Sequence, residues 1–544
     1  PLKSVQELKA LQERILKQQA LNAEKIQVKV HLGTCGISSG AEHTLEAFEN
    51  EIKTRKLTGI IVSPASCIGL CGEEPTVTVL HPDLGRTLYK SLTHDKVSRI
   101  IDQHIVGGRT VAEFMVDTES PRFKYQEVRI LRNQDINPMS IEEYIARGGY
   151  LALAKALTEM EPEQALEEIK KSGLRGRGGA GFTTASKWGF VRSAKGTEKY
   201  VVCNGDEGDP GAYMNRAVLE GNPHSILEGM AIGAYCIGNV KQGYIYVRAE
   251  YPLAIKTLDH AISQARDHGL LGENILGTWF NFDLDIFPGA GAFVCGEETA
   301  LLTSLEGKRG NPRQRPPFPA NEGLYGKPTT LTNVETWSNV PPIILNGADW
   351  FAGVGSRNAP GTKTLCLVGK VKDTGLIEVP LGTSLGKIIF DIGGGIQNNK
   401  KFKGVQLGGP SGGVIPVEHL NTPVDYDSIP PLGAIMGSGG VVVMDEDSCM
   451  VDVAKYFLDF TKDESCGKCI SCREGNPKMY DILCKITEGR ATLNDLKVLE
   501  DLTELVKSAS ICGLGQTAPN PVLTTLRYFR DEYEAHIIDK KCPS

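Results

Sequence analysis

The 544-residue chain lacks a long apolar run, and no stretch reaches the roughly 18 residues that a membrane-spanning helix needs. Its first residues, PLKSVQELKALQERILK, are charged and amphipathic, unlike a signal peptide. Positive charge is not in excess, because 59 Lys and Arg face 66 Asp and Glu for a net charge of −7, whereas nucleic-acid binders usually present a basic face. These absences predict a soluble, cytoplasmic protein that neither spans a membrane nor binds nucleic acid.

Cysteine is sparse, with 14 residues, and no internal repeat or low-complexity tract is present. Hydrophobic residues make up 41% and charged residues 23% of the chain, an ordinary globular mixture that excludes wholesale disorder. Glycine is abundant by contrast, with 61 residues gathered in turn-like motifs. The cysteines are clustered, and clustered thiols in a reducing compartment are more often metal ligands than disulfides.

The length predicts several domains, each marked by a change of pattern. Apolar residues at helical spacing from Leu2 to Ile15 are followed by strand-like runs in a β-α-β-β order, typical of a small α/β domain. Alternating strand-like and helical patterns later predict an α/β domain with a mostly parallel sheet. The predicted units are an N-terminal helix and small domain at 1–105, a linker at 106–139, the α/β domain at 140–350, a small α+β domain at 351–440, a helical domain at 441–535 and a tail at 536–544.

The strongest motif is a C-x2-C-x2-C run at Cys466, Cys469 and Cys472, with Cys512 further along the chain. Three thiolates on one loop plus one distant thiolate supply the four ligands of an iron–sulfur cubane. Structural zinc is the alternative, but it usually uses two separated C-x2-C pairs. The spacing therefore favours a [4Fe–4S] cluster.

Residues 173–182, GLRGRGGAGF, predict an anion-binding loop that opens a helix. Its glycines let backbone N–H groups face an anion, the helix N-terminus adds a favourable dipole, and Arg175, Arg177 and Lys187 add positive charge. The pattern is neither a Walker loop nor a standard Rossmann fingerprint, because no strand directly precedes it. Taken alone, the motif leaves a mobile surface loop as an equal alternative.

Two acidic, turn-rich segments follow strand-like runs at 203–211 and 289–299. They place carboxylates and amide groups at strand ends, where α/β folds bind ligands. Such acceptors suit the hydroxyls of a ribityl chain or a ribose, although Asp, Asn and Gly are common in ordinary turns. Together with the glycine-rich loop, they indicate a phosphate-bearing cofactor.

With PPFPA at 316–320 and TNVET at 332–336, these motifs make residues from about 140 to 535 resemble one family. It is the NADH-oxidising flavoprotein subunit of respiratory complex I and of soluble NAD(P)-linked hydrogenases and formate dehydrogenases. The N-terminal segment resembles a thioredoxin-like [2Fe–2S] ferredoxin, and this fusion resembles the beta subunit of electron-bifurcating hydrogenases. The resemblance implies a multidomain α/β and α+β protein with a thioredoxin-like domain, a Rossmann-like FMN domain, a ubiquitin-like (SLBB) domain and a C-terminal helical bundle carrying an iron–sulfur cluster.

The resemblance also implies binding residues. FMN would be held by Gly176, Arg177, Gly178, Gly179, Lys187, Asn204, Asp206, Glu207, Phe293, Gly296, Glu297, Glu298, Thr332 and Asn333. NAD(P) would be held by Phe182, Phe190, Asp209, Glu298, Arg315 and Phe318, the three phenylalanines sandwiching the adenine. No side chain need act as a general base, because the flavin converts a hydride into single electrons for the cluster.

The N-terminal cysteines depart from the ferredoxin pattern of C-x4-C followed by C-x3-C. Cys67 and Cys71 supply the second pair and Cys35 fits one position of the first, but Val30 stands where its partner is expected. Three thiolates remain, so a [2Fe–2S] cluster needs another ligand or is absent.

The tail brings a third candidate group. His536 and Cys542, together with Cys449, have the ligand types of a zinc or iron site whose last ligand lies beyond residue 544. A purely structural role is the alternative, because lone His and Cys residues are usually structural.

We therefore expect a diaphorase subunit that exchanges hydride between NAD(P)H and FMN and passes single electrons to a [4Fe–4S] cluster, in an electron-bifurcating hydrogenase. The implied partners are other subunits of a hydrogenase- or formate dehydrogenase-type complex, including small iron–sulfur subunits, and ferredoxin. The alternatives are the NADH-oxidising subunit of a formate dehydrogenase or a complex I-like enzyme, an electron-relay adaptor with a vestigial flavin site, and a zinc-stabilised scaffold.

Overall fold

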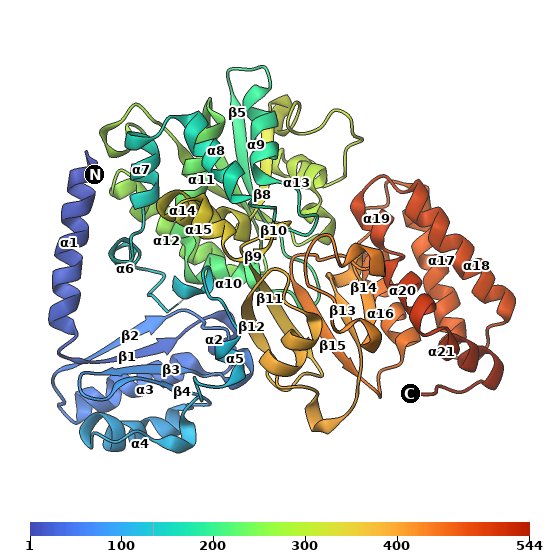
Figure 1. Ribbon diagram of the computed structural model, residues 1–544, viewed down its shortest axis with the longest axis horizontal. Helices are drawn as coiled ribbons and strands as arrows, with labels where there is room; N and C mark the ends of the chain where they lie inside the picture. Colours follow the sequence, from blue (N-terminus) through green and yellow to red (C-terminus); the bar gives the residue numbers. More distant parts are fainter. Residues whose placement is uncertain (134) are drawn as a thin grey trace.

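The chain runs from one end of the molecule to the other through four successive structural parts (Figure 1). The computed structural model describes residues 1–133 and 135–544. The first sheet, at the blue end, lies farthest from the helical C-terminal part at the red end, and two further sheet-containing parts lie between them. No helix in the described residues is both long enough and apolar enough to cross a membrane.

The first helix, α1 (Val5–Asn22), leads into the N-terminal sheet and packs on the central part of the molecule (Figure 1). Its N-terminus is capped by Ser4, whose hydroxyl accepts the Glu7 N–H. Leu8 is buried in the central core, and Gln12 Nε2 donates to the Ile145 carbonyl at 2.9 Å. The amphipathic stripe predicted from the sequence therefore packs against a distant segment, with Leu8 buried and the other members partly buried.

The N-terminal sheet domain has the strand order β2-β1-β3-β4, with β1 parallel to β2 and antiparallel to β3. Its core contains Val28 and Val30 from β1 and Phe48 from the covering helix α3. The elements are β1 (Ile26–His31), α2 (Thr34–Ser38), α3 (Ala41–Thr54), β2 (Ile60–Ala65), β3 (Val77–His81), β4 (Gly85–Tyr89), α4 (Val97–Ile100) and a π-helix (Ile101–Val106).

The segment predicted as a linker contains α5 (Pro121–Lys124) and is anchored on the third structural part. The Glu378 carboxylate accepts the backbone N–H groups of Arg129, Ile130 and Leu131 at 2.9–3.0 Å. The Arg122 guanidinium donates to the carbonyls of Gly69, Asp373 and Thr374. These bonds satisfy buried backbone groups and hold the segment in place.

The central sheet domain is built on a four-stranded, wholly parallel sheet in the order β7-β6-β5-β8, as the alternating pattern predicts. Every residue of α11 is buried, and Trp188 stacks on Trp337 with ring centroids 5.1 Å apart. The elements are α6 (Ile141–Ala146), α7 (Leu151–Glu159), α8 (Pro162–Ser172), α9 (Thr184–Ser193), β5 (Lys199–Gly205), α10 (Met214–Gly221), α11 (Pro223–Ile237), β6 (Val240–Arg248), α12 (Pro252–Asp267), β7 (Asp283–Gly289), α13 (Glu298–Leu305), β8 (Thr329–Asn333), α14 (Val334–Asn346) and α15 (Ala348–Ala352).

The second sheet domain has a five-stranded sheet in the order β12-β11-β15-β13-β14 and a core of its own. Only β11 and β15 are parallel, and the other pairs are antiparallel. The elements are β9 (Gly355–Ser356), β10 (Ala359–Pro360), β11 (Thr362–Gly369), β12 (Gly375–Pro380), a π-helix (Lys387–Ile392), β13 (Phe402–Leu407), β14 (Gly413–Pro416) and β15 (Gly440–Asp445).

The helical C-terminal part has a core of apolar side chains from α16, α17, α18 and α20. A capping box between Thr492 and Asp495 begins α18. The elements are α16 (Met450–Asp463), α17 (Ile470–Thr487), α18 (Leu493–Ala509), α19 (Gly513–Thr517), α20 (Asn520–Tyr528), α21 (Arg530–Glu534) and a final π-helix (Ala535–Asp539). The predicted mixed α/β architecture with a helical C-terminal region is confirmed.

Candidate functional site

A cavity of about 600 Å³ lies where the central sheet domain, the second sheet domain and the helical C-terminal part meet. All the predicted FMN residues except Arg177 line it, and so do Phe182, Asp209 and Glu298 from the predicted NAD(P) set. A second cavity, of about 560 Å³, lies between the linker and α14 and contains none of the predicted site residues.

The sequence did not reveal that two other parts of the chain help to build this cavity. The second sheet domain contributes a wall through Gly408, Ser411, Ile435, Gly437 and Ser438, and the C-terminal part contributes Gly513, Leu514 and Thr517. Two sequence features could have indicated these contributions to the cavity. They are the glycine-rich composition around Gly408 and the position of Gly513 next to the predicted ligand Cys512. The central sheet domain also adds Thr184 and Asn215, which no motif singled out, and Thr336, the last residue of the TNVET motif.

The glycine-rich loop between α8 and α9 approaches the second sheet domain too closely for side chains. Gly181 has a φ of +63°, and a Cβ there would lie 2.4 Å from the Tyr426 ring. A Cβ on Gly179, whose φ is +132°, would lie 3.3 Å from the Gly437 Cα. The loop precedes the N-terminus of α9, so its backbone is placed to receive an anion.

The two arginines of this loop have a different role from the one predicted. The Arg177 guanidinium is fully buried and donates to the carbonyls of Arg175, Pro360 and Thr362. Arg175 donates to the Gly181 carbonyl and pairs with Asp427 at 3.0 Å. The expectation that the Arg177 side chain faces the cofactor is therefore corrected, because its guanidinium holds the loop onto the second sheet domain through the carbonyls of Pro360 and Thr362.

Buried carboxylates form the opposite wall of the cavity. Burial raises the pKa of Asp206 to about 7, although the Arg248 guanidinium at 3.3 Å opposes the shift. Burial likewise raises the pKa of Glu207 to about 7 and that of Asp209 to about 6. Within the described residues, Asp206 Oδ2 is buried without a hydrogen-bond partner. An unpaired acceptor in a cavity wall fits a ligand that brings hydroxyl groups.

Lys187 brings positive charge into the cavity from α9. Its Nζ donates to the Leu331 carbonyl at 2.7 Å and pairs with Glu298 Oε1 at 2.6 Å. Arg315 lies outside the cavity lining, with its guanidinium 3.9 Å from both Glu297 and Glu298. Opposite charges at this rim are suited to a ligand with both phosphate and hydroxyl groups.

Three phenylalanines remain on the surface. Phe182 and Phe190 are 53% and 56% exposed, with ring centroids 6.4 Å apart, and Phe318 is 54% exposed. Phe190 and Phe318 lie outside the cavity lining, whereas Phe182 belongs to it. Exposed aromatic faces beside a cavity are suited to stacking a planar ring.

The four cysteines of the C-terminal motif share one apolar cluster with Phe293 and Val294, which line the cavity. Cys472 and Cys512 are buried, and Cys466 and Cys469 are half-buried. Burial alone would raise the pKa of the Cys469 thiol, but the N–H groups of Ile511 and Cys472 and nearby hydroxyls lower it below its ordinary value. Burial raises the pKa of Cys472 to about 11 and also raises that of Cys512. The structure therefore brings all four predicted ligands beside the cavity.

The three N-terminal cysteines also come together. The thiol of Cys71 is in hydrogen-bonding contact with those of Cys35 and Cys67. The group lies against α10 of the central sheet domain, where Arg216 Nη2 donates to Cys35 Sγ at 3.7 Å and Glu220 accepts the Thr34 N–H (Figure 1). Val30, the position of the expected fourth cysteine, is fully buried in the hydrophobic core.

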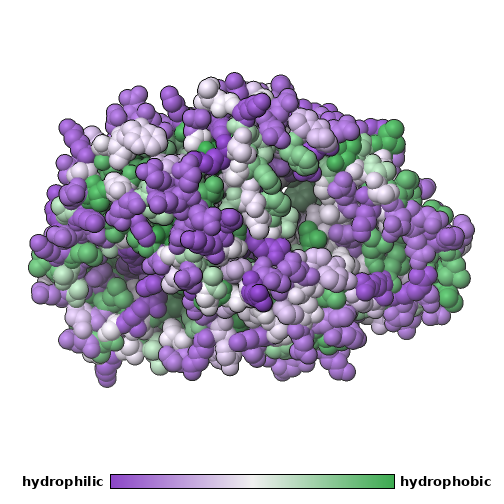
Figure 2. All heavy atoms as spheres, turned by 45° about the horizontal axis from the view of Figure 1, so that its top comes forward, coloured by the Kyte–Doolittle hydropathy of each residue, from purple (hydrophilic) through white to green (hydrophobic). Residues whose placement is uncertain are grey.

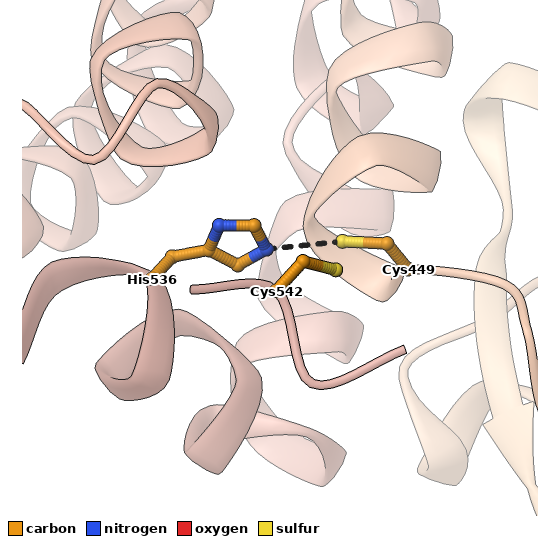
Figure 3. A group of neighbouring side chains, drawn as sticks. All are labelled: Cys449, His536 and Cys542. Atoms are coloured by element: carbon orange, nitrogen blue, oxygen red, sulfur yellow. Dashed lines mark hydrogen bonds between the residues drawn. The ribbon is translucent and has the colours of Figure 1, made fainter. Parts of the chain in front are cut away.

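The third candidate group converges at the C-terminal end of the chain (Figure 3). The ligand atoms of Cys449, His536 and Cys542 all lie within 4.8 Å of one another, and Cys449 Sγ is 3.3 Å from His536 Nε2. No other group of three or more His, Cys, Asp or Glu residues in the described ranges is as compact. Because sulfur ligands of one tetrahedral zinc ion lie about 3.8 Å apart, this group has the size of a mononuclear site.

Comparison with known proteins agrees with this arrangement. Residues 169–342 match the Nuo51 FMN-binding domain, and residues 452–536 match the NADH-ubiquinone oxidoreductase-F iron-sulfur binding region. The cavity and the four-cysteine group fall largely within these ranges. The chain belongs to the family of the F subunits of NADH-quinone oxidoreductases, and the resemblance seen in the sequence is confirmed.

Particular relatives show how far the similarity extends. The chain is 58% identical over 409 residues, 75% of its length, to the NADP-reducing hydrogenase subunit HndC of Solidesulfovibrio fructosivorans, 83% of which is covered. It is 40% identical over 74% of its length to the F subunit of the NADH-quinone oxidoreductase of Escherichia coli, of which 91% is covered. An H2-reduced NAD+-reducing [NiFe]-hydrogenase structure superposes with a TM-score of 0.68 at 29% identity, covering 94% of this chain and 84% of the other.

Proposed function

We propose that this chain is the NAD(P)H-oxidising, FMN- and iron–sulfur-containing subunit of a hydrogenase-type complex. The observation that carries the proposal is the cavity that adjoins the four-cysteine group, because Phe293 and Val294 line the first and pack with the second. A flavin held there would have a cluster as its immediate neighbour. Such adjacency is what an enzyme needs to convert hydride chemistry into one-electron transfer.

The residues present fit FMN. The glycine-rich loop offers backbone N–H groups at a helix start, Lys187 supplies a cation, and Asp206 presents an unpaired acceptor among the described residues. When bound, FMN accepts two electrons as a hydride and releases them singly. The protein positions the ring, excludes water and supplies hydrogen-bond partners.

The proposed NAD(P) site lies at the rim, where Phe182 and Glu298 line the cavity and the Phe190 ring lies beside that of Phe182, with centroids 6.4 Å apart. The exposed rings are placed to stack the adenine, and the Glu298 carboxylate to accept ribose hydroxyls. Arg315 keeps a positive charge nearby, and preference between NADH and NADPH does not follow from these contacts.

Replacing Glu298 with alanine is expected to weaken NADH binding while FMN is retained. The change removes the carboxylate paired with Lys187 but leaves the glycine-rich loop and Asp206 in place. Loss of one charged hydrogen-bond acceptor costs about 1.5–3 kcal/mol, or roughly 10- to 150-fold in affinity. Titration of flavin reduction against NADH, with FMN content measured after denaturation, checks this. FMN loss at unchanged NADH affinity would mean that the two subsites are assigned the wrong way round.

The type and the bounds of the individual domains are also part of the proposal. The mixed sheet of the N-terminal domain supports a thioredoxin-like domain within residues 1–105 that holds a [2Fe–2S] centre at Cys35, Cys67 and Cys71. The five-stranded sheet supports a ubiquitin-like SLBB domain at 351–440, although β15 continues to Asp445. The 441–535 region supports a [4Fe–4S] helical domain at Cys466, Cys469, Cys472 and Cys512.

We assign a single zinc ion to Cys449, His536 and Cys542. His536 lies on the last π-helix and Cys449 precedes α16, so the ion would fasten the end of the chain to the start of the helical part (Figure 3). The compact ligand set fits one tetrahedral ion better than a cluster.

Removing this metal is expected to lower stability without removing the flavin. At free metal concentrations 100 to 1,000 times Kd, binding contributes about 2.7–4.1 kcal/mol to the free energy of unfolding. Metal analysis measures the bound ion, and thermal unfolding with and without a chelator measures its contribution to stability. The Cys542→Ala variant is the control, because chelation should change its unfolding no further. Equal chelator sensitivity of the variant and the wild type would contradict the assignment.

Partner subunits would take electrons at the exposed side of the C-terminal cysteine group. Ile470 and Ile511 flank Cys469 and Cys512 in the chain, and both are exposed. In Figure 2 this face is mostly hydrophilic, with hydrophobic atoms interspersed across it, including over the helical C-terminal part. This surface supports docking of a small iron–sulfur subunit or ferredoxin.

The higher identity to the hydrogenase subunit than to the complex I subunit favours a hydrogenase-type complex, whether or not it bifurcates electrons. Identifying the subunits that co-purify with the native chain tests this choice against a formate dehydrogenase or complex I-like enzyme. FMN released on denaturation separates the enzyme from a flavin-free relay adaptor.

A further inference from the structure

We propose that the Glu74 carboxylate is the fourth ligand of the N-terminal iron–sulfur centre and completes a set with Cys35, Cys67 and Cys71. The proposal rests on the [2Fe–2S] assignment made under the proposed function. It names a ligand of this chain that the cysteine pattern cannot show, since the chain has no fourth cysteine at the expected place.

The arrangement of the three thiols fits a dinuclear centre. The Cys71 thiol is in hydrogen-bonding contact with the thiols of both Cys35 and Cys67. Among the described residues, the ligand atoms of the Cys449 group all lie within 4.8 Å of one another, whereas those of this group are spread more widely. Ligands of a single zinc ion lie about 3.8 Å apart, so three thiols that do not all lie within 4.8 Å of one another do not form as compact a mononuclear site as the Cys449 group.

Strand β1 supplies no fourth ligand. The Val30 side chain is fully buried in the core. Its backbone lies between Pro64 of β2 and Val77 of β3 in the sheet. The next residue, His31, has both ring nitrogens engaged, with Nδ1 2.7 Å from the Ser66 carbonyl and Nε2 3.0 Å from Thr78 Oγ1. The missing ligand must come from another segment.

Glu74 lies directly beside the thiols. Its Oε1 is 3.9 Å from Cys67 Sγ, while its Oε2 accepts from the N–H and hydroxyl of Thr76 at 2.8 and 2.9 Å. Oε2 would also lie 3.4 Å from a Cβ built on Gly36, the residue after Cys35. One oxygen is thus anchored by the protein, and the other faces the sulfur group.

Hydrogen-bond donors of the protein surround the three thiols. The Gly69 N–H donates to Cys67 Sγ at 3.3 Å, and Arg216 donates to Cys35 Sγ at 3.7 Å. The Tyr213 side chain is in hydrogen-bonding contact with Cys71. Donors around ligand sulfurs are usual for iron–sulfur centres, and a carboxylate carries the same single charge as the thiolate it replaces. The Arg216 guanidinium, from α10, offsets part of the negative charge of the proposed ligands.

A purely structural role for Glu74 is the competing explanation, because Oε2 already caps the turn at Thr76. The Glu74→Gln variant separates the two roles: its amide oxygen can still accept the Thr76 N–H, but a neutral amide is a poor iron ligand. Glu73→Gln is the matched control, since Glu73 is the adjacent carboxylate and pairs with Lys90 at the surface at 3.0 Å.

The test uses the full chain, reconstituted anaerobically with iron and sulfide. Wild type and Glu73→Gln should hold the two N-terminal irons in addition to the four of the C-terminal cluster. Glu74→Gln should lose those two irons and the N-terminal EPR signal, and keep FMN and the C-terminal signal. Should that variant misfold, ENDOR of wild type carrying ¹³C-labelled glutamate should still show coupling between the reduced centre and a carboxylate carbon.

Full N-terminal iron and an unchanged EPR spectrum in Glu74→Gln would overturn the proposal, as would the absence of carboxylate coupling. A wild-type chain without N-terminal iron would also overturn it. That last result would leave FMN binding and the C-terminal cluster untouched, so failure of this inference is distinct from failure of the proposed function.

Discussion

Replacing Cys469 with serine is expected to leave reduction of FMN by NADH intact and to block electron transfer out of the chain. Cys469 lies at the N-terminus of α17, in the apolar cluster that joins the cavity to the cysteine group. Changes to groups around a metal site cost about 10- to 100-fold, and loss of a ligand should cost at least as much.

The measurement follows flavin bleaching by NADH in a stopped-flow instrument, together with the rate of reduction of cytochrome c. This protein acceptor is too large to enter a cavity of about 600 Å³. Cys484→Ser is the matched control, because Cys484 is another half-buried cysteine on α17 but lies outside the ligand set. A Cys469→Ser chain that reduced cytochrome c at the wild-type rate would remove the cluster from the exit route.

Replacing Gly181 with alanine is expected to reduce FMN affinity by at least about tenfold. Its φ of +63° is a left-handed conformation that costs an L-residue roughly 1–2 kcal/mol. The new Cβ would also lie 2.4 Å from the Tyr426 ring, so the loop or the second sheet domain must shift. A cost of about 1.4 kcal/mol already corresponds to tenfold in binding.

FMN binding is measured by quenching of flavin fluorescence in chains stripped of the cofactor. Gly189→Ala is the control, since a Cβ there meets nothing within 4 Å and alanine favours the helix. We expect Gly189→Ala to bind FMN as the wild type does. Unchanged affinity in Gly181→Ala would show that the close approach of loop and ring does not shape the flavin site.

Local motifs were enough to predict the parts of the site that are continuous in sequence. Helix α8 ends at Ser172, directly before the predicted glycine-rich loop, and the acidic turn after β5 lies in the cavity wall as expected. Cys466, Cys469 and Cys472 gather in one cluster because their spacing within one loop is a local property, whereas Cys512 joins them from a distant part of the chain.

What the sequence did not show depends on contacts between distant segments. The Arg177 guanidinium does not line the cavity because it donates to the carbonyls of Pro360 and Thr362. These carbonyls belong to a distant segment, so no local sequence pattern predicts the contact. The packing of α1 on the central core and the position of Glu74 beside Cys67 are of the same kind. Amphipathic spacing predicts that a face is buried, but it does not identify the partner.

The central claim is that electrons enter this chain in pairs at a flavin and leave it singly through the cluster beside it. Rapid freeze-quench EPR of the anaerobically reconstituted chain, mixed with NADH, tests the claim most directly. The account predicts that flavin absorbance falls first and that the signal of the reduced C-terminal cluster then rises within the same turnover. A chain that bleaches with NADH but never develops the cluster signal, or one that holds clusters and no flavin, would contradict it.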